Sequence, residues 1–282
     1  MTLKAIWFLE PAVALLARLN GESGPEGRLT GSSDQQYDAL MAGEADVAVT
    51  SMDNVMDWNL RDASADFAIV AQIERTTRLT LMGRPGVTDF ADIRDGDLLV
   101  DAPANGFVVA ARMVLAEEGL NEGDYDLLPA GGVRERLAAL LSGEGEATLL
   151  GPPFDFQAAD AGASRLAVVN DRYPDYPGQG LVIRRSALER CVDDLTAWLD
   201  AMKRALGAAD LPGAAARFAD TGMPAPVAEA FAASLPDSLT PDRAGVERVI
   251  SQRRALGLRG GDVSYDDLVP TLTAGSGAAT IS

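Results

Sequence analysis

The sequence predicts an α/β protein of two lobes, each a mainly parallel sheet flanked by helices, with a ligand cleft where the lobes meet. Two observations predict this fold. Strand and helix patterns alternate along residues 3–184, as they do in parallel α/β architecture. The segment 33–50 also recurs in outline at 133–150, and four residues are unchanged between the copies: Ala39, Leu40, Gly43 and Glu44 match Ala139, Leu140, Gly143 and Glu144. Each copy has the pattern of a short helix ended by glycine, an acidic turn and a buried strand, so two similar lobes are expected.

The individual elements are predicted from apolar periodicity and turn residues. In the first round, strands are expected at 3–9, 26–30, 45–49, 67–73 and 79–84, and helices at 11–20 and 34–41. The second round has strands at 97–100, 147–150, 166–170 and 180–184, and helices at 107–118 and 137–141. From residue 188 the pattern is helical only, at 188–206, 212–219, 226–233 and 242–256. The small, polar tail 274–282 is expected to be disordered.

Two Pro-Gly turns predict where the chain passes from one lobe to the other. They are Arg84-Pro85-Gly86 and Tyr176-Pro177-Gly178. Residues 85–177 would then form the second lobe, inserted into a first lobe made of 1–84 and 178–282, which includes the C-terminal helices. Because the chain crosses twice, the connection is expected to act as a hinge.

Charge and hydropathy limit the partners and the location. With 42 acidic against 24 basic side chains, the formal net charge of -18 would repel phosphate backbones, so no nucleic acid partner is expected. No apolar run approaches the roughly 20 residues of a membrane helix, so no membrane insertion is expected. The N-terminus has no export-signal pattern. The sequence therefore predicts a cytoplasmic protein, or a periplasmic one if an upstream signal has been removed, and leaves the oligomeric state unknown.

Two absences exclude many enzyme classes. The chain has no His, which removes Ser-His-Asp and Cys-His catalysis and His-based zinc or haem sites. The single Cys191 cannot form an internal disulfide, and it lies in a helical pattern, where a core or half-exposed residue is expected rather than a reactive thiol. No acidic spacing matches a calcium loop, and no phosphate-binding glycine loop is present. We therefore expect no metal and no cofactor.

Several motifs are similar to a known family. They are 31–36 (GSSDQQ) before a helix, 43–50 (GEADVAVT), Asp53-Asn54 and 84–93 (RPGVTDFADI), and the order of 97–106, 143–153 and the helical block agrees. The sequence resembles ABC-transporter solute-binding proteins of the nitrate, sulfonate and taurine type. These share the type II periplasmic-binding-protein fold with the pyrimidine-precursor synthases of thiamine metabolism. The resemblance covers nearly all of the chain and implies a ligand held between the lobes, with an ABC permease as partner if the protein is exported. Two departures are the missing export signal and the missing His that the synthases need.

The candidate ligand-binding residues follow from the same architecture. In parallel α/β sheets, ligands bind beyond the carboxyl ends of strands, beside helix N-termini. The residues at these positions are Phe8, Glu10, Pro11, Ser32, Ser33, Thr50, Ser51, Asp53, Asn54, Asp101, Asn105, Gly106, Phe107, Gly131, Gly132, Pro152, Phe154 and Asp155. Structural roles remain open for several: the serines suit helix N-caps, the glycine pair suits a turn, and Phe154 suits a core.

Four of the candidates are acidic, which bears on the ligand. Glu10, Asp53, Asp101 and Asp155 each follow a predicted strand, so four carboxylates would surround one cleft. They would repel sulfonate, nitrate or phosphate by several kcal/mol at intermediate dielectric. An amine or a nitrogen heterocycle is therefore expected, with carboxylates accepting its N–H groups. The alternative is that some of these carboxylates cap helices or pair with Arg75, Arg78 or Arg112.

Two functional hypotheses follow. The first is a binding protein that traps a small solute by hinge closure. The second is a cytosolic, metal-independent lyase, decarboxylase or hydrolase on the same scaffold. In that case Glu10 would be the general acid or base, since lobe closure would desolvate it, with Asp53 or Asp101 as its partner.

Overall fold

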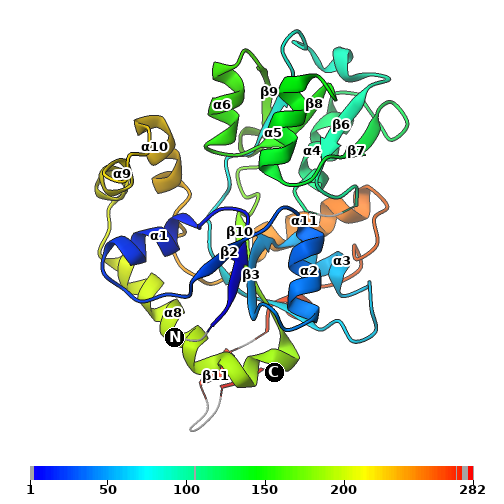
Figure 1. Ribbon diagram of the computed structural model, residues 1–282. Coiled ribbons are helices and arrows are strands. Elements are labelled where there is room, and N and C mark those ends of the chain that lie inside the picture. The colour runs from blue at the N-terminus through cyan, green and yellow to red at the C-terminus, as the bar shows by residue number, and fades with distance from the viewer. Residues whose placement is uncertain (1–2, 105, 271, 275–278, 282) are drawn as a thin grey trace.

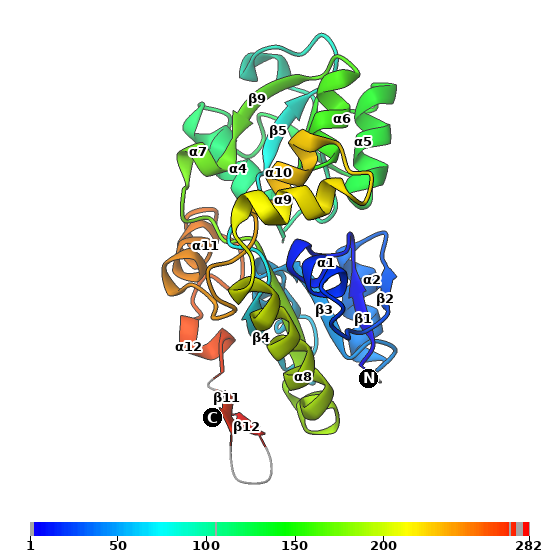
Figure 2. The ribbon, with the colours of Figure 1, turned by 90° about the vertical axis from the view of Figure 1, so that its left-hand side faces the viewer.

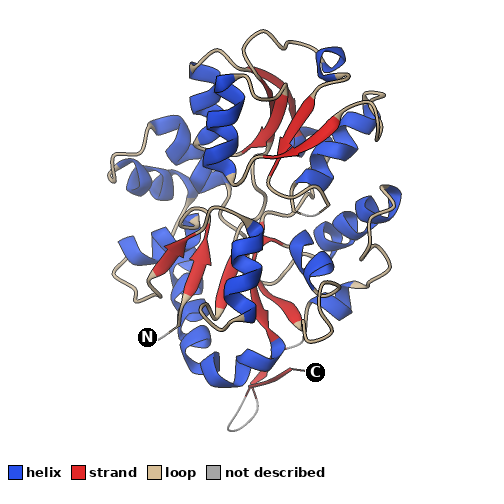
Figure 3. Ribbon diagram, turned by 45° about the vertical axis from the view of Figure 1, so that its right-hand side comes forward, coloured by secondary structure: helices blue, strands red, loops and turns tan. Residues whose placement is uncertain are grey.

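The computed structural model describes residues 3–104, 106–270, 272–274 and 279–281 (Figure 1). Within them the strands form two separate five-stranded mixed sheets, each flanked by helices, and a C-terminal hairpin (Figure 3). The α/β prediction of two sheets is confirmed.

The first lobe contains the sheet with strand order β2-β1-β3-β10-β4. Its strands are β1 (Ala5–Trp7), β2 (Gly27–Leu29), β3 (Val47–Ser51), β4 (Phe67–Gln72) and β10 (Gln179–Arg184). β1 pairs in parallel with β2 and β3, whereas β10 is antiparallel to β3 and β4. The antiparallel strand, β10, is the strand that the chain forms when it returns from the second lobe.

The second lobe repeats this plan with strand order β7-β6-β8-β5-β9. Its strands are β5 (Thr80–Gly83), β6 (Asp97–Val100), β7 (Asp126–Pro129), β8 (Ala147–Leu150) and β9 (Ser164–Val168). β6 is parallel to β7 and β8, and β5 is antiparallel to β8 and β9. β5 is again the first strand after the chain crosses between lobes.

The sequence repeat corresponds to matching elements in the two lobes. α2 (Ser33–Met41) leads into β3, and α5 (Val133–Ser142) leads into β8 at the equivalent sheet position. Gly43 (φ 70°) and Gly143 (φ 82°) follow these helices in the left-handed conformation that glycine adopts easily. The prediction of two helices ended by glycine is confirmed.

The remaining helices cover the sheets and join the lobes. They are α1 (Ala12–Leu19), α3 (Asp53–Trp58), α4 (Val108–Glu117), α6 (Phe154–Asp160), α7 (Val169–Arg172), α8 (Leu188–Gly207), α9 (Leu211–Ala219), α10 (Ala225–Ala233), α11 (Arg243–Ala255) and α12 (Tyr265–Leu268). Short 3-10 turns, η1 and η2, span Phe90–Ile93 and Arg185–Ala187. α1 and α8 pack side by side on the first lobe (Figure 2), where Trp7 of β1 lies beside Trp198 of α8. Trp7 and Trp58 are both buried in the core.

The first lobe boundary differs from the prediction of 84/85. Residues 80–83, assigned to the first lobe, form β5 of the second lobe, so the first crossing lies between Gln72 and Thr80. The Pro85-Gly86 turn instead follows the outer end of β5, where the Val87 N–H donates to the Arg84 carbonyl. A Pro-Gly pair marks a turn, and it does not distinguish a lobe boundary from the end of a strand.

The sequence analysis does not predict the short elements α3, α6, α7, α12 and β7. The expectation that the tail 274–282 is disordered is wrong for the described part of that tail, because β11 (Leu272–Ala274) pairs antiparallel with β12 (Ala279–Ile281). Residues 275–278 and 282 lie outside the described part of the chain.

The single cysteine and the hydropathy of the helices agree with the sequence-based expectations. Cys191 is buried in α8, and burial raises the pKa of its thiol to about 11, as suits a core residue rather than a reactive one. In the described ranges, no helix combines the length and the apolar character that crossing a membrane requires.

Candidate functional site

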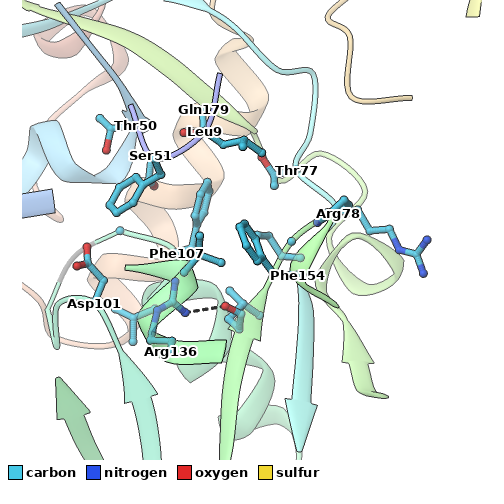
Figure 4. A pocket seen from close by; sticks show the side chains of 18 of the residues that line it. Leu9, Thr50, Ser51, Thr77, Arg78, Asp101, Phe107, Arg136, Phe154 and Gln179 are labelled. Atoms are coloured by element: carbon cyan, nitrogen blue, oxygen red, sulfur yellow. Dashed lines mark hydrogen bonds between the residues drawn. The ribbon is translucent and has the colours of Figure 1, made fainter. Parts of the chain in front are cut away.

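A cavity of about 150 Å³ lies between the two lobes (Figure 4). The ends of β1 and β3 contribute Phe8, Leu9, Glu10, Thr50, Ser51 and Asn54 from the first lobe. The second lobe contributes Asp101, Ala102, Gly106, Phe107, Arg136, Leu149, Pro152 and Phe154. The crossing segments add Glu74, Thr77, Arg78 and Gln179, and α10 adds Ala230, Phe231 and Ser234. The cavity is therefore built from both lobes and from the connection between them.

Ten of the predicted ligand-binding residues line this cavity: Phe8, Glu10, Thr50, Ser51, Asn54, Asp101, Gly106, Phe107, Pro152 and Phe154. Seven others do not: Pro11, Ser32, Ser33, Asp53, Gly131, Gly132 and Asp155. Asn105 lies outside the described residues. The strand-end rule thus predicted residues on both sides of the cavity wall, because it does not distinguish side chains that face the cavity from those that face the lobe interior.

Several residues outside the cavity lining join the lobes at its edge. The Ser33 N–H of α2 donates to the Asp101 carboxylate of the second lobe at 3.1 Å. Arg134 donates to the Phe8 carbonyl at 2.9 Å. A Cβ placed on Gly132 would lie 2.8 Å from the carbonyl oxygen of Gly31, so the backbones approach too closely there for any larger residue. Ser32 caps α2 by accepting from the Gln35 N–H, which was the structural alternative for this serine.

Asp53 does not face the cavity. Its side chain is fully buried, and Nη1 of Arg253 lies 2.8 Å from both of its carboxylate oxygens. The Gly106 N–H also donates to it at 2.6 Å. Burial raises the pKa of Asp53 to about 6, while Arg253 and the Gly106 N–H oppose that rise. Asp53 is thus a structural partner of Arg253.

Asp155 is also directed into the protein. Its side chain is fully buried, accepts from the Thr80 hydroxyl at 3.3 Å and lies 3.8 Å from Arg78. Burial raises the pKa of this carboxyl, and Arg78 lowers it. The expectation of four carboxylates around the cleft is therefore wrong, because two of the four lie behind the cavity wall.

Glu74 is a cavity carboxylate that the sequence reasoning missed. It lies on the first crossing segment and accepts from the Gln179 N–H at 3.3 Å, from the Gln179 amide at 3.2 Å and from the Thr77 hydroxyl. Burial raises the pKa of Glu74. Because Gln179 begins β10 on the return crossing, Glu74 joins the two crossing segments at the edge of the cavity. No motif marks this position, but its place directly after a buried strand was a usable signal.

Arg136 is the second missed residue and brings a positive charge to the cavity. It lies in the first turns of α5, where Nη1 donates to the Thr148 hydroxyl at 3.1 Å and to the Leu149 carbonyl at 2.6 Å (Figure 4). Its Nε is buried and has no hydrogen-bond partner among the described residues. Burial lowers the pKa of the guanidinium, and nearby Asp101 raises it. Arg134 and Glu135 precede Arg136, and such a run of charges is typical of a solvated helix face.

The carboxylates of Asp101 and Glu10 have different hydrogen-bond partners, a backbone N–H for Asp101 and a guanidinium for Glu10. Burial raises the pKa of Asp101, and the bonds from Ser33 oppose that rise. Glu10 receives two hydrogen bonds from Arg18, at 2.8 and 3.0 Å, and about a third of its side chain is exposed. The guanidinium of Arg78 points away from the cavity (Figure 4). Besides Glu10, which is paired with Arg18, the charged groups that line the cavity are Asp101, Glu74 and Arg136.

The two lobes with a double crossing and a cavity at their junction form the type II periplasmic-binding-protein fold, and comparison with solved structures confirms it. The ligand-binding component of an ABC-type import system from Staphylococcus aureus, solved with zinc bound, aligns over 95% of each chain (TM-score 0.76, 17% identity). The periplasmic nitrate-binding protein NrtA from Synechocystis PCC 6803 aligns over 94% of this chain and 83% of its own (TM-score 0.77, 13% identity).

A third similar structure is the alkanesulfonate-binding protein SsuA from Xanthomonas axonopodis pv. citri bound to MOPS, which aligns over 90% of each chain (TM-score 0.69, 20% identity). The fold inferred from the motifs is thus confirmed. No protein-family model and no curated protein matches the chain.

Proposed function

We propose that this protein is a solute-binding protein of the ABC import type, which closes its two lobes around one small organic molecule. The observation that carries the proposal is the cavity between the lobes, since both lobes and both crossing segments line it. A binding site of this composition is complete only when the lobes are together, so binding and closure are coupled. The fold shared with import-system binding proteins supports an ABC permease as the partner.

The cavity favours a small ligand with an apolar body. A volume of about 150 Å³ is comparable to cavities that hold one benzene molecule. Phe8, Phe107 and Phe154 supply aromatic surface from three separate segments. Stacking and burial against such rings stabilise a flat molecule in particular. A single-ring compound fits both the size and the lining.

The charges favour a ligand that carries nitrogen. Asp101 and Glu74 can accept N–H groups, while Arg136 can donate to a carbonyl or ring nitrogen. We therefore propose a nitrogen heterocycle or a small amine, in keeping with the prediction from the sequence. Nitrate and sulfonate, after which the similar binding proteins are named, would meet Arg136 but also two carboxylates.

The enzyme hypothesis rests on Glu10 and has less support. Glu10 is paired with Arg18, Asp53 with Arg253, and Asp101 with the Ser33 N–H, so the described residues offer no free acid and base facing each other. Turnover of a bound compound that Glu10→Gln abolishes while binding persists would establish the enzyme instead.

The location stays a prediction, with the periplasm as the alternative to the cytoplasm. An import receptor must reach the outer side of the membrane. A genomic reading frame that starts upstream with an export signal would support the receptor role.

The proposal predicts which molecules the protein retains. Native mass spectrometry of freshly purified protein should show a neutral or cationic passenger. In calorimetric titrations, uracil and imidazole should bind more tightly than methanesulfonate and nitrate. Asp101→Asn should weaken uracil binding about ten- to a hundredfold, because a hydrogen bond to a charged acceptor becomes a neutral one.

The matched control for this variant is Asp126→Asn, since Asp126 is exposed on β7 of the same lobe and away from the cavity. It should bind uracil as the wild type does. A sulfonate passenger, or equal effects of the two substitutions, would overturn the ligand assignment.

A further inference from the structure

Asp53 and Arg253 form an ion pair that lies entirely within the first lobe. Asp53 begins α3, Arg253 lies on α11, and neither side chain has any exposed surface. Arg253 also donates through Nε to the Arg259 carbonyl at 2.9 Å. Burying two charges carries a large desolvation cost, which is offset only when their remaining donors and acceptors are satisfied.

The groups that complete this pair come from the second lobe. The Gly106 N–H donates to Oδ2 of Asp53 at 2.6 Å, and Nη1 of Arg253 donates to the Ala104 carbonyl at 3.1 Å. Both backbone groups belong to the segment between β6 and α4. Since the bonds cross the junction between the lobes, opening the lobes would leave the charges without these partners.

The same segment lines the ligand cavity. Ala102, Gly106 and Phe107 are cavity residues, whereas Asp53 and Arg253 are not. Gly106 has φ 78°, and a Cβ there would lie 3.3 Å from the Asn54 amide oxygen, so its backbone fits closely against α3. The ion pair is therefore connected to the ligand site through the backbone of Gly106 and its neighbour Phe107.

We propose that Asp53 and Arg253 are positioning residues, which bind the backbone of Ala104 and Gly106 and so hold the second lobe in the closed arrangement that completes the cavity. This inference rests on the proposed binding function, because the cavity is taken to be the ligand site. The hydrogen bonds between the lobes form without a ligand. The inference assigns to α3 and α11 a role that no ligand contact would reveal.

A pair of double variants isolates the contact that crosses the lobes. Asp53→Asn with Arg253→Met removes both charges but keeps an acceptor for the Gly106 N–H. Asp53→Ala with Arg253→Met removes the charges and the acceptor. Both lose the buried guanidinium, so a purely structural role predicts the same behaviour for the two proteins.

The positioning role predicts different behaviour. In the Ala/Met protein, the Gly106 amide should exchange with solvent at least tenfold faster than in the Asn/Met protein. X-ray scattering should show a larger radius of gyration, and uracil should bind at least tenfold more weakly. Equal exchange rates and equal radii would overturn the inference.

The exchange and scattering measurements need no ligand, so they separate this inference from the proposed function. If uracil fails to bind the wild type, the ligand assignment fails while amide exchange still tests the pair. If a double variant does not fold, amide exchange is measured on the wild type alone. A Gly106 amide that exchanges with solvent as fast as an exposed amide would then overturn the inference.

Discussion

At the scale of single residues, the contact between the lobes depends on a glycine at the point where their backbones approach. Gly132 has φ -70°, which any residue adopts. Glycine is therefore required at this position because a side chain would not fit, and not because of the backbone conformation. The nearest atoms to an added Cβ belong to Gly31 of the other lobe, to Glu135 and to Phe8. Gly131 and Gly132, predicted as ligand contacts, do not line the cavity, and Gly132 instead lies where the backbones of the two lobes approach.

Gly132→Ala should therefore oppose closure without unfolding either lobe. We expect about tenfold weaker binding of uracil, a larger radius of gyration and little change in thermal stability, because the methyl group collides with backbone across the junction. The matched control is Gly207→Ala, whose Cβ would meet nothing within 4 Å. Unchanged affinity in the Gly132 variant would contradict this account.

At the scale of elements, helix capping accounts for a serine that the sequence predicts as a ligand contact. Ser32 accepts from the Gln35 N–H at 3.1 Å at the start of α2, and Ser33 then presents its own N–H to Asp101. Such a cap satisfies one of the backbone donors that a helix leaves unpaired. Ser32 therefore acts on the site only through the position of α2.

Ser32→Ala should cost about 1 kcal/mol of unfolding free energy, the usual value for a lost N-cap. Ser32→Asn should retain most of the stability, since its side chain can accept the same bond. Urea denaturation measures both. Ser251→Ala, at an exposed position within α11, serves as the control and should change stability by only a few tenths of a kcal/mol. A loss for Ser32→Asn as large as that for Ser32→Ala would argue against capping.

At the scale of the whole molecule, burial of acids makes stability depend on pH. The pKa of Asp53 is raised to about 6 in the folded protein, against 3.8 for the ordinary carboxyl. Between these values the folded state binds more protons than the unfolded state. The contribution of Asp53 to unfolding free energy therefore falls as pH rises from about 4 to 6, by about 3 kcal/mol in total.

The double variant Asp53→Asn with Arg253→Met removes this titration. Urea denaturation from pH 4 to 7 gives the unfolding free energy of both proteins. The value for the wild type minus the value for the variant should fall as pH rises. The subtraction cancels other groups, including Asp101 and Glu74, whose pKa values are also raised. A difference that is independent of pH would show that Asp53 does not titrate in this range.

The fold was more predictable than the site. The copies at 33–50 and 133–150 carry their own helix, glycine stop and strand, so local pattern sufficed to predict matched lobes. Strand ends then predicted the position of the cavity. Arg136 escaped prediction because a charged residue in a helix has the same sequence pattern whether it faces solvent or a cavity, whereas Glu74 carried the strand-end signal that identified other lining residues.

By itself, the sequence determined the α/β class, the internal repeat and the strand ends that lie near the ligand cavity, because these follow from periodicity and glycine placement over short stretches of chain. Only the tertiary structure decided which carboxylates face that cavity. Asp53 meets Arg253 across 200 residues of sequence, and Asp155 turns toward Thr80 and Arg78. The direction of a side chain and its compensating charge depend on segments far apart in the chain, and packing alone brings those segments together.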